Sequence, residues 1–240
     1  MSSRNTAPRD SVEHADWQTV ASDLNARGHA VIKGMLDSAA CDALRDLYPH
    51  EAPFRSRIVM ARHGFGSGEY KYFSYPLPEP VAALRSALYP HLAPIANRWF
   101  SRMGMDPTFP DTHEAFLERC HAAGQMRPTP LLLQYEAGDY NCLHQDLYGP
   151  TVFPLQVAIL LSQPGTDFEG GEFVLVEQRP RMQSRAEVVA LSQGDAVVFA
   201  VSERPVAGSR GDYRVKMRHG VSRLRTGRRH TLGIIFHDAA

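Results

Sequence analysis

The pattern of apolar and polar positions along the chain changes near residue 130. Before that point apolar residues recur at the spacing of one helix face, which predicts a mainly helical first half. Asp37 and Asp111 stand at capping positions where two of these helices begin. The expected helices cover residues 11–27, 38–48, 79–104 with a break near Pro90 and Pro94, and 112–123, with a short strand at 29–33 between the first two.

After residue 130 the chain consists of short runs rich in Val, Ile, Leu and Phe, separated by Gly and Pro. This pattern is typical of a β-sandwich or barrel. A set of such strands after a helical layer predicts an α+β fold whose core is a double-stranded β-helix, or jelly-roll. The expected strands are 130–136, 153–161, 172–177, 187–191, 196–201, 213–219 and 230–237.

The expected organisation is one integrated domain in three parts. Residues 1–9 form a disordered tail, residues 10–129 the helical N-terminal layer, and residues 130–240 the jelly-roll core. A length of 240 residues with 43% hydrophobic content is enough for one sizeable core. Within the helical layer, residues 62–73 combine glycines with aromatic side chains, which suggests a mobile lid. A hairpin packed on the sheet remains an alternative for this segment.

The composition of the chain limits the cellular compartments in which we expect the protein. No apolar run approaches the length of a membrane-spanning helix, and no signal-peptide pattern opens the chain. The three cysteines, Cys41, Cys120 and Cys142, are odd in number and follow no zinc-binding spacing. We therefore expect a cytoplasmic protein without membrane association.

The net charge is zero, but the charges are unevenly distributed. Residues 179–230 carry 12 Lys and Arg against 4 Asp and Glu, and the rest of the chain is correspondingly acidic. Strand alternation places Arg214, Lys216 and Arg218 on one face and His219 on the other. This basic stripe could contact an anionic partner such as DNA or RNA, or it could simply keep the outer face of a sheet soluble.

Two histidines and one carboxylate are the strongest candidates for chemistry. His144 and Asp146 follow a predicted strand and a glycine turn, and His219 ends a later strand. Two His and one carboxylate can occupy one face of an octahedral metal and leave three positions open, as in non-haem Fe(II) oxygenases. The similar pair His14 and Asp16 lies on an amphipathic helix, so we interpret it as part of a solvated helix face.

Two further residues are expected close to this metal site. Arg229 follows His219 by about the length of a strand, where an arginine could anchor a dicarboxylate. The neighbouring Arg228 should point outward, although a one-residue bulge would exchange the two. Tyr135 precedes the glycine turn before His144, although it could simply fill the interior of the barrel.

Five elements in the last 110 residues resemble the Fe(II)/2-oxoglutarate-dependent dioxygenase superfamily, including its AlkB-like and prolyl-hydroxylase-like members. They occur in the same order as in that superfamily. A narrower similarity, at residues 177–184 and 232–238, is to a bacterial subfamily predicted to act on damaged nucleic acid. The five elements are Tyr135 before His144-Gln-Asp146, the Gly-Gly segment 168–173, the strand 194–199, His219-Gly-Val, and Gly227 with Arg229 and Leu232.

The chain departs from both branches of the superfamily at individual positions. Leu133 stands where AlkB-type enzymes carry an asparagine, and no second arginine follows Arg229. Arg223 occupies the position of a proline in prolyl hydroxylases. The superfamily is therefore matched more closely than either branch.

The resemblance implies an enzyme, an Fe(II)- and 2-oxoglutarate-dependent oxygenase. His144, Asp146 and His219 would hold Fe(II), while Arg229 and Tyr135 would bind 2-oxoglutarate, which is converted with O2 into succinate and carbon dioxide. The expected reaction is oxidative dealkylation of a modified nucleobase in DNA or RNA. Hydroxylation of a protein side chain, as in prolyl hydroxylases, or of a small molecule is an alternative, as is a non-catalytic jelly-roll binding module.

Substrate contacts are expected from two places in the chain. Basic and aromatic side chains together can hold an unstacked base. No obligate protein partner is inferred. The candidate substrate residues are Arg62, Phe65, Tyr70, Tyr72 and Phe73 from the expected lid, and Arg214, Lys216 and Arg218 from the basic stripe.

Overall fold

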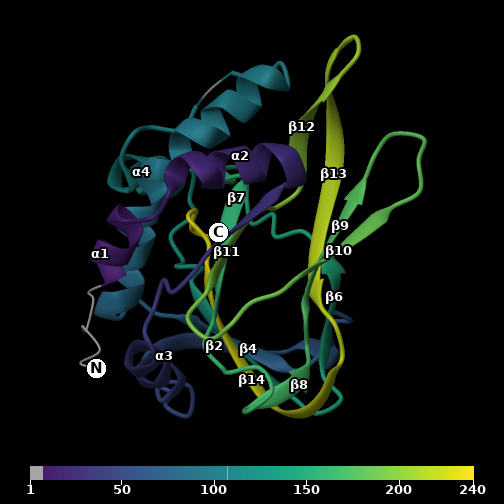
Figure 1. The fold of residues 1–240 in the computed structure, drawn as a ribbon. Coiled ribbons are helices and arrows are strands. Elements are labelled where there is room, and N and C mark those ends of the chain that lie inside the picture. The colour runs from purple at the N-terminus through teal and green to yellow at the C-terminus, as the bar shows by residue number, and fades with distance from the viewer. Residues whose placement is uncertain (1–7, 107) are drawn as a thin grey trace.

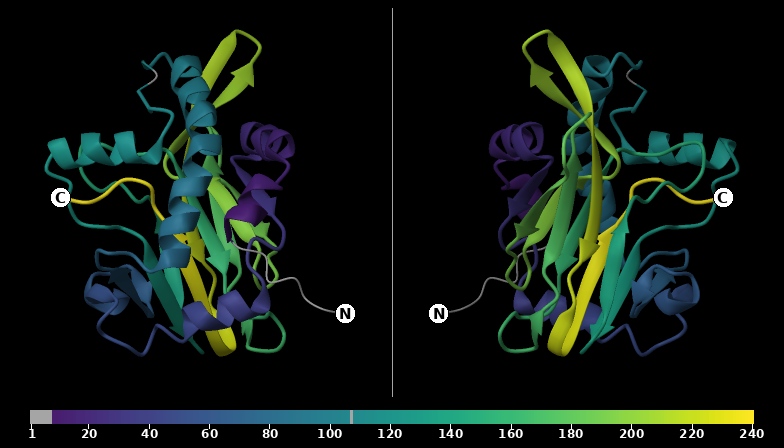
Figure 2. Two further views of the ribbon diagram at one scale, coloured as in Figure 1. Left: turned by 90° about the vertical axis from the view of Figure 1, so that its left-hand side faces the viewer. Right: turned by 90° about the vertical axis from the view of Figure 1, so that its right-hand side faces the viewer.

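Two antiparallel β-sheets lie face to face, and helices cover the outer side of the larger sheet (Figures 1 and 2). This computed structural model describes residues 8–106 and 108–240. None of the helices in this part of the chain is both long and apolar enough to cross a bilayer. The helices are α1 (Pro8–Glu13), α2 (Trp17–Arg27), α3 (Ser38–Arg45), α4 (Glu79–Arg102) and α5 (His113–Ala122), with a 3-10 turn η1 at Met60–Arg62.

The larger sheet has eight strands in the order β1-β11-β7-β14-β5-β4-β2, with β8 also paired to β14. Its central strands β7 and β11 are buried at every position, because one face meets the smaller sheet and the other meets the helices. The strands are β1 (His29–Ile32), β2 (Phe54–Val59), β4 (Glu69–Phe73), β5 (Leu131–Glu136), β7 (Leu155–Leu160), β8 (Phe168–Gly170), β11 (Ala196–Ala200) and β14 (Leu224–Ile234).

The smaller sheet has the order β10-β9-β13-β6-β3, with β12 paired to β13. Along β13 buried and exposed residues alternate, so one face contributes to the interior and the other meets solvent. The two facing sheets form the jelly-roll core that the sequence predicts. The strands are β3 (Gly66–Ser67), β6 (Tyr140–His144), β9 (Phe173–Gln178), β10 (Arg185–Val189), β12 (Glu203–Gly208) and β13 (Gly211–Val221).

The N-terminal region differs from the expected single helix over residues 11–27. It contains two helices, α1 and α2, and the break falls where the Asp16 side chain accepts a hydrogen bond from the backbone N–H of Thr19 and so caps α2. The expected disordered tail is wrong for residues 8 and 9, which begin α1. The remainder of that tail, residues 1–7, lies outside the described residues.

Helix α4 runs without a break through Pro90 and Pro94, against expectation. A proline inside a helix removes one backbone hydrogen bond and leaves a carbonyl without its partner. Both prolines lie on the exposed side of α4, where water can satisfy those carbonyls. The opposite side buries Leu88, Leu92 and Trp99 in the main core, and this packing keeps the helix continuous.

The expected mobile lid at residues 62–73 is wrong for most of its length. Residues 66–67 form β3 and residues 69–73 form β4, which is hydrogen-bonded between β2 and β5 in the larger sheet. Phe73 is fully buried in the main core. The alternative, a hairpin packed on the sheet, is correct only in that the segment belongs to the sheets. Strand β3 pairs with β6, and β4 pairs with β2 and β5, so the two do not form a hairpin with each other. Only residues 62–65 and Gly68 belong to neither strand, and Arg62 ends the 3-10 turn η1.

Several strands were missed because their sequences lack a long apolar run. These are β2, β6, β8 and β12. Strand β14 begins at Leu224 rather than at residue 230, because its first half contains arginines that sequence patterns assign to a loop. Pairing with β5 and β8 holds this basic half in the sheet, with Arg229 opposite Tyr135.

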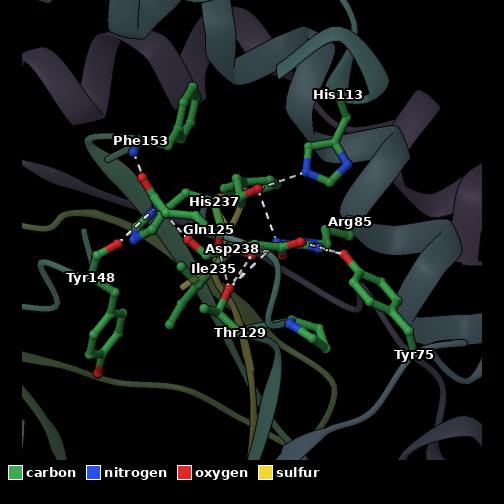
Figure 3. Close-up of polar contacts among 12 residues, drawn as sticks. Tyr75, Arg85, His113, Gln125, Thr129, Tyr148, Phe153, Ile235, His237 and Asp238 are labelled. Atoms are coloured by element: carbon green, nitrogen blue, oxygen red, sulfur yellow. Dashed lines mark hydrogen bonds and ion pairs between the residues drawn. The ribbon is translucent and has the colours of Figure 1, made fainter. Parts of the chain in front are cut away.

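A buried polar cluster fastens the C-terminal segment to the helical layer (Figure 3). Arg85 of α4 forms an ion pair with Asp238 at 2.8 Å, and both side chains are almost fully buried. Tyr75 and His121 also contact the Asp238 carboxylate at 2.9 Å. Burial alone would raise the pKa of Asp238, but Arg85 and these two contacts outweigh burial and lower it.

We expect Asp238→Asn to lower the free energy of unfolding at pH 7 by about 3–5 kcal/mol, because it leaves Arg85 buried without a counter-charge. A folded-state pKa below the unfolded value stabilises the protein above about pH 4, and this contribution is lost as the pH falls through the folded-state pKa. The difference between wild type and variant should therefore shrink in acid. Urea unfolding at several pH values measures it.

Asp212→Asn is the matched control, since it removes the carboxylate of the more exposed Arg102–Asp212 pair. That variant should lose much less stability than Asp238→Asn, because an exposed ion pair is screened by solvent. Equal losses in the two variants would contradict the role assigned to the buried pair.

Candidate active site

Three metal-binding side chains come together on neighbouring strands of the smaller sheet. His144 ends β6, and it pairs in register with His219 of β13. Asp146 lies in the loop just after β6, and Gln145 ties this loop to β13 by donating to the Met217 carbonyl at 2.8 Å. The ligand atoms of the two histidines and Asp146 all lie within 4.8 Å of one another.

The geometry fits a facially bound metal ion. The Nε2 atoms of His144 and His219 lie 3.5 and 3.4 Å from the two Asp146 carboxylate oxygens. Adjacent ligands of an octahedral metal with bonds of about 2.1 Å are about 3 Å apart, so a small contraction would complete the site. Nδ1 of His144 lies 2.8 Å from the Cys142 carbonyl. This contact assigns the proton to Nδ1 and leaves the Nε2 lone pair for a metal.

The charges of the cluster also suit a cation. Burial opposes ionisation of Asp146, but His144 and His219 outweigh burial and hold its pKa well below the usual value. Burial lowers the pKa of His219, which favours the neutral imidazole that metals bind. The ring of His219 packs against Phe199 and Phe173, with ring centroids 4.6 and 6.1 Å away.

Arg229 points into the same cavity as the metal-binding cluster and is only 2% exposed. Its Nη1 donates to Thr231 Oγ1 at 2.6 Å, and its Nε has no hydrogen-bond partner in the part of the chain that the structure describes. Burial lowers its pKa to about 10, so the side chain stays cationic at neutral pH. A buried cation with free donors is suited to an anion such as a carboxylate. Arg228 points outward and pairs with Glu136.

Tyr135 is fully buried and lines the cavity beside Arg229, whose guanidinium carbon lies 5.7 Å from the ring centroid. The Tyr135 hydroxyl accepts a hydrogen bond from Asn141 at 3.4 Å. Burial raises the pKa of Tyr135 to about 12, so the hydroxyl keeps its proton and can itself donate. The residue therefore fills the barrel and also offers a donor to the cavity.

The cavity that joins these residues has a volume of about 320 Å³ and is lined mainly by apolar side chains. Its charged lining residues are His144, Asp146, His219 and Arg229, and Cys142 and three tyrosines are its other titratable lining residues. Apolar walls lower the local dielectric and so strengthen the few polar contacts inside the cavity. Apolar lining residues include Leu131, Leu133, Val157, Ala158, Phe173, Phe199, Val221, Ile234 and Ile235.

The candidate substrate residues divide into four groups. Phe65 and Tyr70 line the cavity, and Phe65 is 47% exposed at its rim. Arg62 is exposed outside the cavity lining, while Tyr72 and Phe73 are buried within the sheet, so the expected stacking role of Phe73 is wrong. The basic stripe (Arg214, Lys216 and Arg218) is exposed on the outer face of the smaller sheet, opposite the side that carries His219.

Several polar cavity residues were missed in the sequence, among them Asn141, Tyr148, Gln156 and Thr231. Only Thr231 carried a signal, because it shares the inward face of β14 with Arg229 two residues earlier. The other three lie in a short polar strand, in a loop and in the middle of an apolar strand, where no spacing distinguishes them.

Residues 68–239 match the model of a family described as oxygenases catalysing oxidative methylation of damaged DNA. The match includes His144, Asp146, His219 and Arg229. The chain belongs to this oxygenase family. Within it, a Mycobacterium tuberculosis protein, MT2286, is 52% identical over 168 residues, which cover 70% of this chain and 72% of that protein. A second M. tuberculosis sequence, Rv2227, matches to the same extent.

The fold of this oxygenase is similar to solved structures of 2-oxoglutarate-Fe(II) oxygenases. A Pseudomonas putida prolyl-4-hydroxylase superposes with a TM-score of 0.57 at 15% identity, covering 93% of this chain and 100% of that one. A Burkholderia pseudomallei oxidoreductase of the 2OG-Fe(II) oxygenase family gives a TM-score of 0.56 at 14% identity, covering 95% and 94%. These similarities establish the jelly-roll fold.

We expect Arg229→Ala to weaken 2-oxoglutarate binding at least about tenfold, since a lost charge-assisted hydrogen bond costs about 1.5–3 kcal/mol. Arg228→Ala removes the same charge one residue away, on the outer face, and should leave the affinity nearly unchanged. Anaerobic calorimetry with Mn(II) in place of iron compares the two. Greater sensitivity at Arg228 would show that the wrong arginine has been assigned to the cosubstrate.

Proposed function

We propose that this oxygenase binds Fe(II) through His144, Asp146 and His219, uses 2-oxoglutarate, and removes an alkyl group from a damaged nucleobase. One observation carries the proposal: the metal-binding cluster and the buried Arg229 open into the same apolar cavity. Two histidines and one carboxylate leave three positions of the metal open, and the same apolar cavity holds a cation for a dicarboxylate. This combination supports a 2-oxoglutarate-dependent oxygenase.

The protein's part in the reaction is to bind and orient. Fe(II) bound with 2-oxoglutarate supplies the activation of dioxygen that C–H oxidation requires. Arg229 would hold the distal carboxylate of 2-oxoglutarate with its free donors, and Thr231 keeps the guanidinium in place. Tyr135 would donate a hydrogen bond from its protonated hydroxyl. Together these contacts direct the keto-acid end of the cosubstrate toward the histidines.

Aromatic and apolar residues lie at the rim of the cavity. Such residues favour a substrate with a planar, largely uncharged group. Phe65 and Leu143 line the cavity and are 47% and 46% exposed, so both offer apolar surface at its mouth. The Phe65 carbonyl accepts a hydrogen bond from the Cys142 N–H at 2.9 Å, which ties the rim loop to β6. A base turned out of its helix can be held by stacking on such side chains.

The basic stripe provides a possible contact for the phosphate backbone. Arg218 immediately precedes His219, and His219 pairs with His144, so the stripe ends one strand away from Leu143 at the cavity rim. Its residues point away from the metal cluster, so we assign them to the backbone of a nucleic acid rather than to the base. The family's description names damaged DNA, which agrees with this assignment.

The proposed reaction balances as an oxidation followed by a spontaneous cleavage. One oxygen atom from O2 enters a C–H bond of an N-methyl group and gives N–CH2OH, while 2-oxoglutarate takes the other oxygen and becomes succinate and carbon dioxide. The N–CH2OH group then loses formaldehyde and leaves N–H on the base. The loss of formaldehyde needs no acid or base from the protein, because the proton can exchange with solvent.

The product of the reaction tests this proposal. We expect the iron-loaded enzyme to convert N-methylated oligonucleotides into products lighter by one CH2 unit, with formaldehyde and succinate released in equal amounts. His219→Ala should abolish all three products. Mass spectrometry of the oligonucleotides, with a proline-rich peptide library and free nucleobases assayed in parallel, separates the possibilities. A gain of one oxygen on a peptide, with unchanged oligonucleotides, would assign the enzyme to side-chain hydroxylation instead.

The dependence of binding on salt tests the basic stripe separately. For single strands the log–log slope of affinity against salt is about −0.7 per phosphate contact, so three contacts predict a slope of roughly −2. Lys216→Ala combined with Arg218→Ala should reduce its magnitude by about 1.4. Arg27→Ala with Arg98→Ala, which removes two exposed charges from the helical layer, is the matched control. An identical slope in both double variants would leave the stripe without a role in binding.

A further inference from the structure

Both oxygens of the Asp146 carboxylate are held by hydrogen bonds that do not come from the histidines. The Tyr148 hydroxyl donates to Oδ1 at 2.7 Å, and Nε2 of Gln156 donates to Oδ2 at 3.0 Å. Each oxygen therefore has one donor in addition to the neighbouring imidazole. Two donors on opposite oxygens fix the plane of a carboxylate, which would otherwise rotate about its Cβ–Cγ bond.

Tyr148 itself is fixed by contacts on its ring. The ring lies edge-on to Tyr72, with centroids 6.5 Å apart, and its centroid is 6.2 Å from that of His237. Tyr72 is a sheet residue of β4, and His237 is fully buried in the C-terminal segment. The ring therefore lies between two rigid parts of the structure, and its hydroxyl has little freedom to leave Asp146.

The backbone of Tyr148 is fixed by a single buried amide, that of Gln125 (Figure 3). Nε2 of Gln125 donates to the carbonyls of Tyr148 and Thr151, both at 3.0 Å, and Oε1 accepts from the Thr151 N–H at 2.8 Å. The same Nε2 contacts the Asp238 carbonyl in the C-terminal segment. Gln125 thus joins the loop that follows Asp146 to the buried cluster around Arg85.

The loop also requires glycine next to Tyr148. Gly149 has a φ of +93°, and a Cβ atom there would lie 2.7 Å from Cδ of Gln125. The close approach of this backbone to the Gln125 amide is therefore built into the loop.

We infer that Tyr148 is a positioning residue for the Asp146 carboxylate, and that Gln125 acts through Tyr148. This inference rests on the proposed metal site. Hydrogen-bonded groups behind a metal ligand orient it toward the ion, and their removal typically weakens metal binding about 10–100-fold. Here the chain Gln125–Tyr148–Asp146 connects the C-terminal segment to the metal site, so the packing of that segment sets the ligand geometry.

Tyr148→Phe is the decisive variant, because it keeps the packed ring and removes only the hydroxyl. We expect Mn(II), used as a redox-stable probe, to bind the otherwise intact protein at least about tenfold more weakly in calorimetry. The increase in melting temperature caused by Mn(II) should shrink in parallel, since stabilisation by a ligand follows its affinity. Circular dichroism verifies that the fold is retained.

Tyr48→Phe is the matched control. The Tyr48 hydroxyl also donates to a carboxylate, that of Glu69 at 2.9 Å, but this pair lies outside the cavity lining. The control should lose stability without losing Mn(II) affinity. A purely structural role for Tyr148 predicts that the two variants behave alike, and an unchanged Mn(II) affinity in Tyr148→Phe would overturn the inference.

Gln125→Met tests the second half of the inference, because it keeps the length of the side chain and removes the amide. It should weaken Mn(II) binding in the wild-type background and add little in the Tyr148→Phe background. Equal effects in both backgrounds would mean that Gln125 does not act through Tyr148. Absence of Mn(II) binding in the wild type would instead refute the metal site itself, so failure of the proposed function remains distinguishable from failure of this inference.

Discussion

The antiparallel pairing of β6 with β13 is the interaction on which the active site depends. It brings His144 beside His219 although they are far apart in sequence, and the short step from β6 into the next loop supplies Asp146. Backbone hydrogen bonds hold the two strands, so the imidazoles belong to a rigid sheet rather than to flexible loops. Metal sites tolerate little error in the positions of their ligands, and two hydrogen-bonded strands provide the required accuracy.

The second constraint is that the site must combine apolar walls with a buried charge. Strand β14 meets this demand by alternation: Arg229 and Thr231 face the cavity, while Arg228 faces solvent and pairs with Glu136. Burial of Arg229 is costly without a counter-ion. Thr231 accepts from one of its donors, and its Nε has no partner among the residues that the structure describes. The cavity therefore has a cationic end suited to a carboxylate ligand. The apolar walls then make that single charge more effective.

The helical layer contributes to the site indirectly. Helix α4 buries Arg85, which binds Asp238 and thereby holds the C-terminal segment against the loop that follows Asp146. Gln125 bonds the backbone carbonyl of Tyr148, and the hydroxyl of the same residue bonds the metal-binding carboxylate. Tyr148 thus connects the C-terminal segment with Asp146. This connection gives a physical reason for the helices to pack on the outer side of the larger sheet, beyond covering its apolar strands.

Local patterns were sufficient for those features that depend on neighbouring residues. Strand alternation separated Arg228 from Arg229 and Lys216 from His219, because period-two geometry is a property of short segments. The metal-binding cluster was indicated by its residue types, two histidines and one carboxylate, and by their places at predicted strand ends. Long-range contacts decided the rest. The segment expected to be a lid became β4 because β2 and β5 pair with it, and α4 stayed helical through its prolines because its other face is buried. The hydrogen bonds of Tyr148, Gln156 and Gln125 around the site join residues whose positions in the sequence share no period. Only the tertiary structure could therefore reveal them.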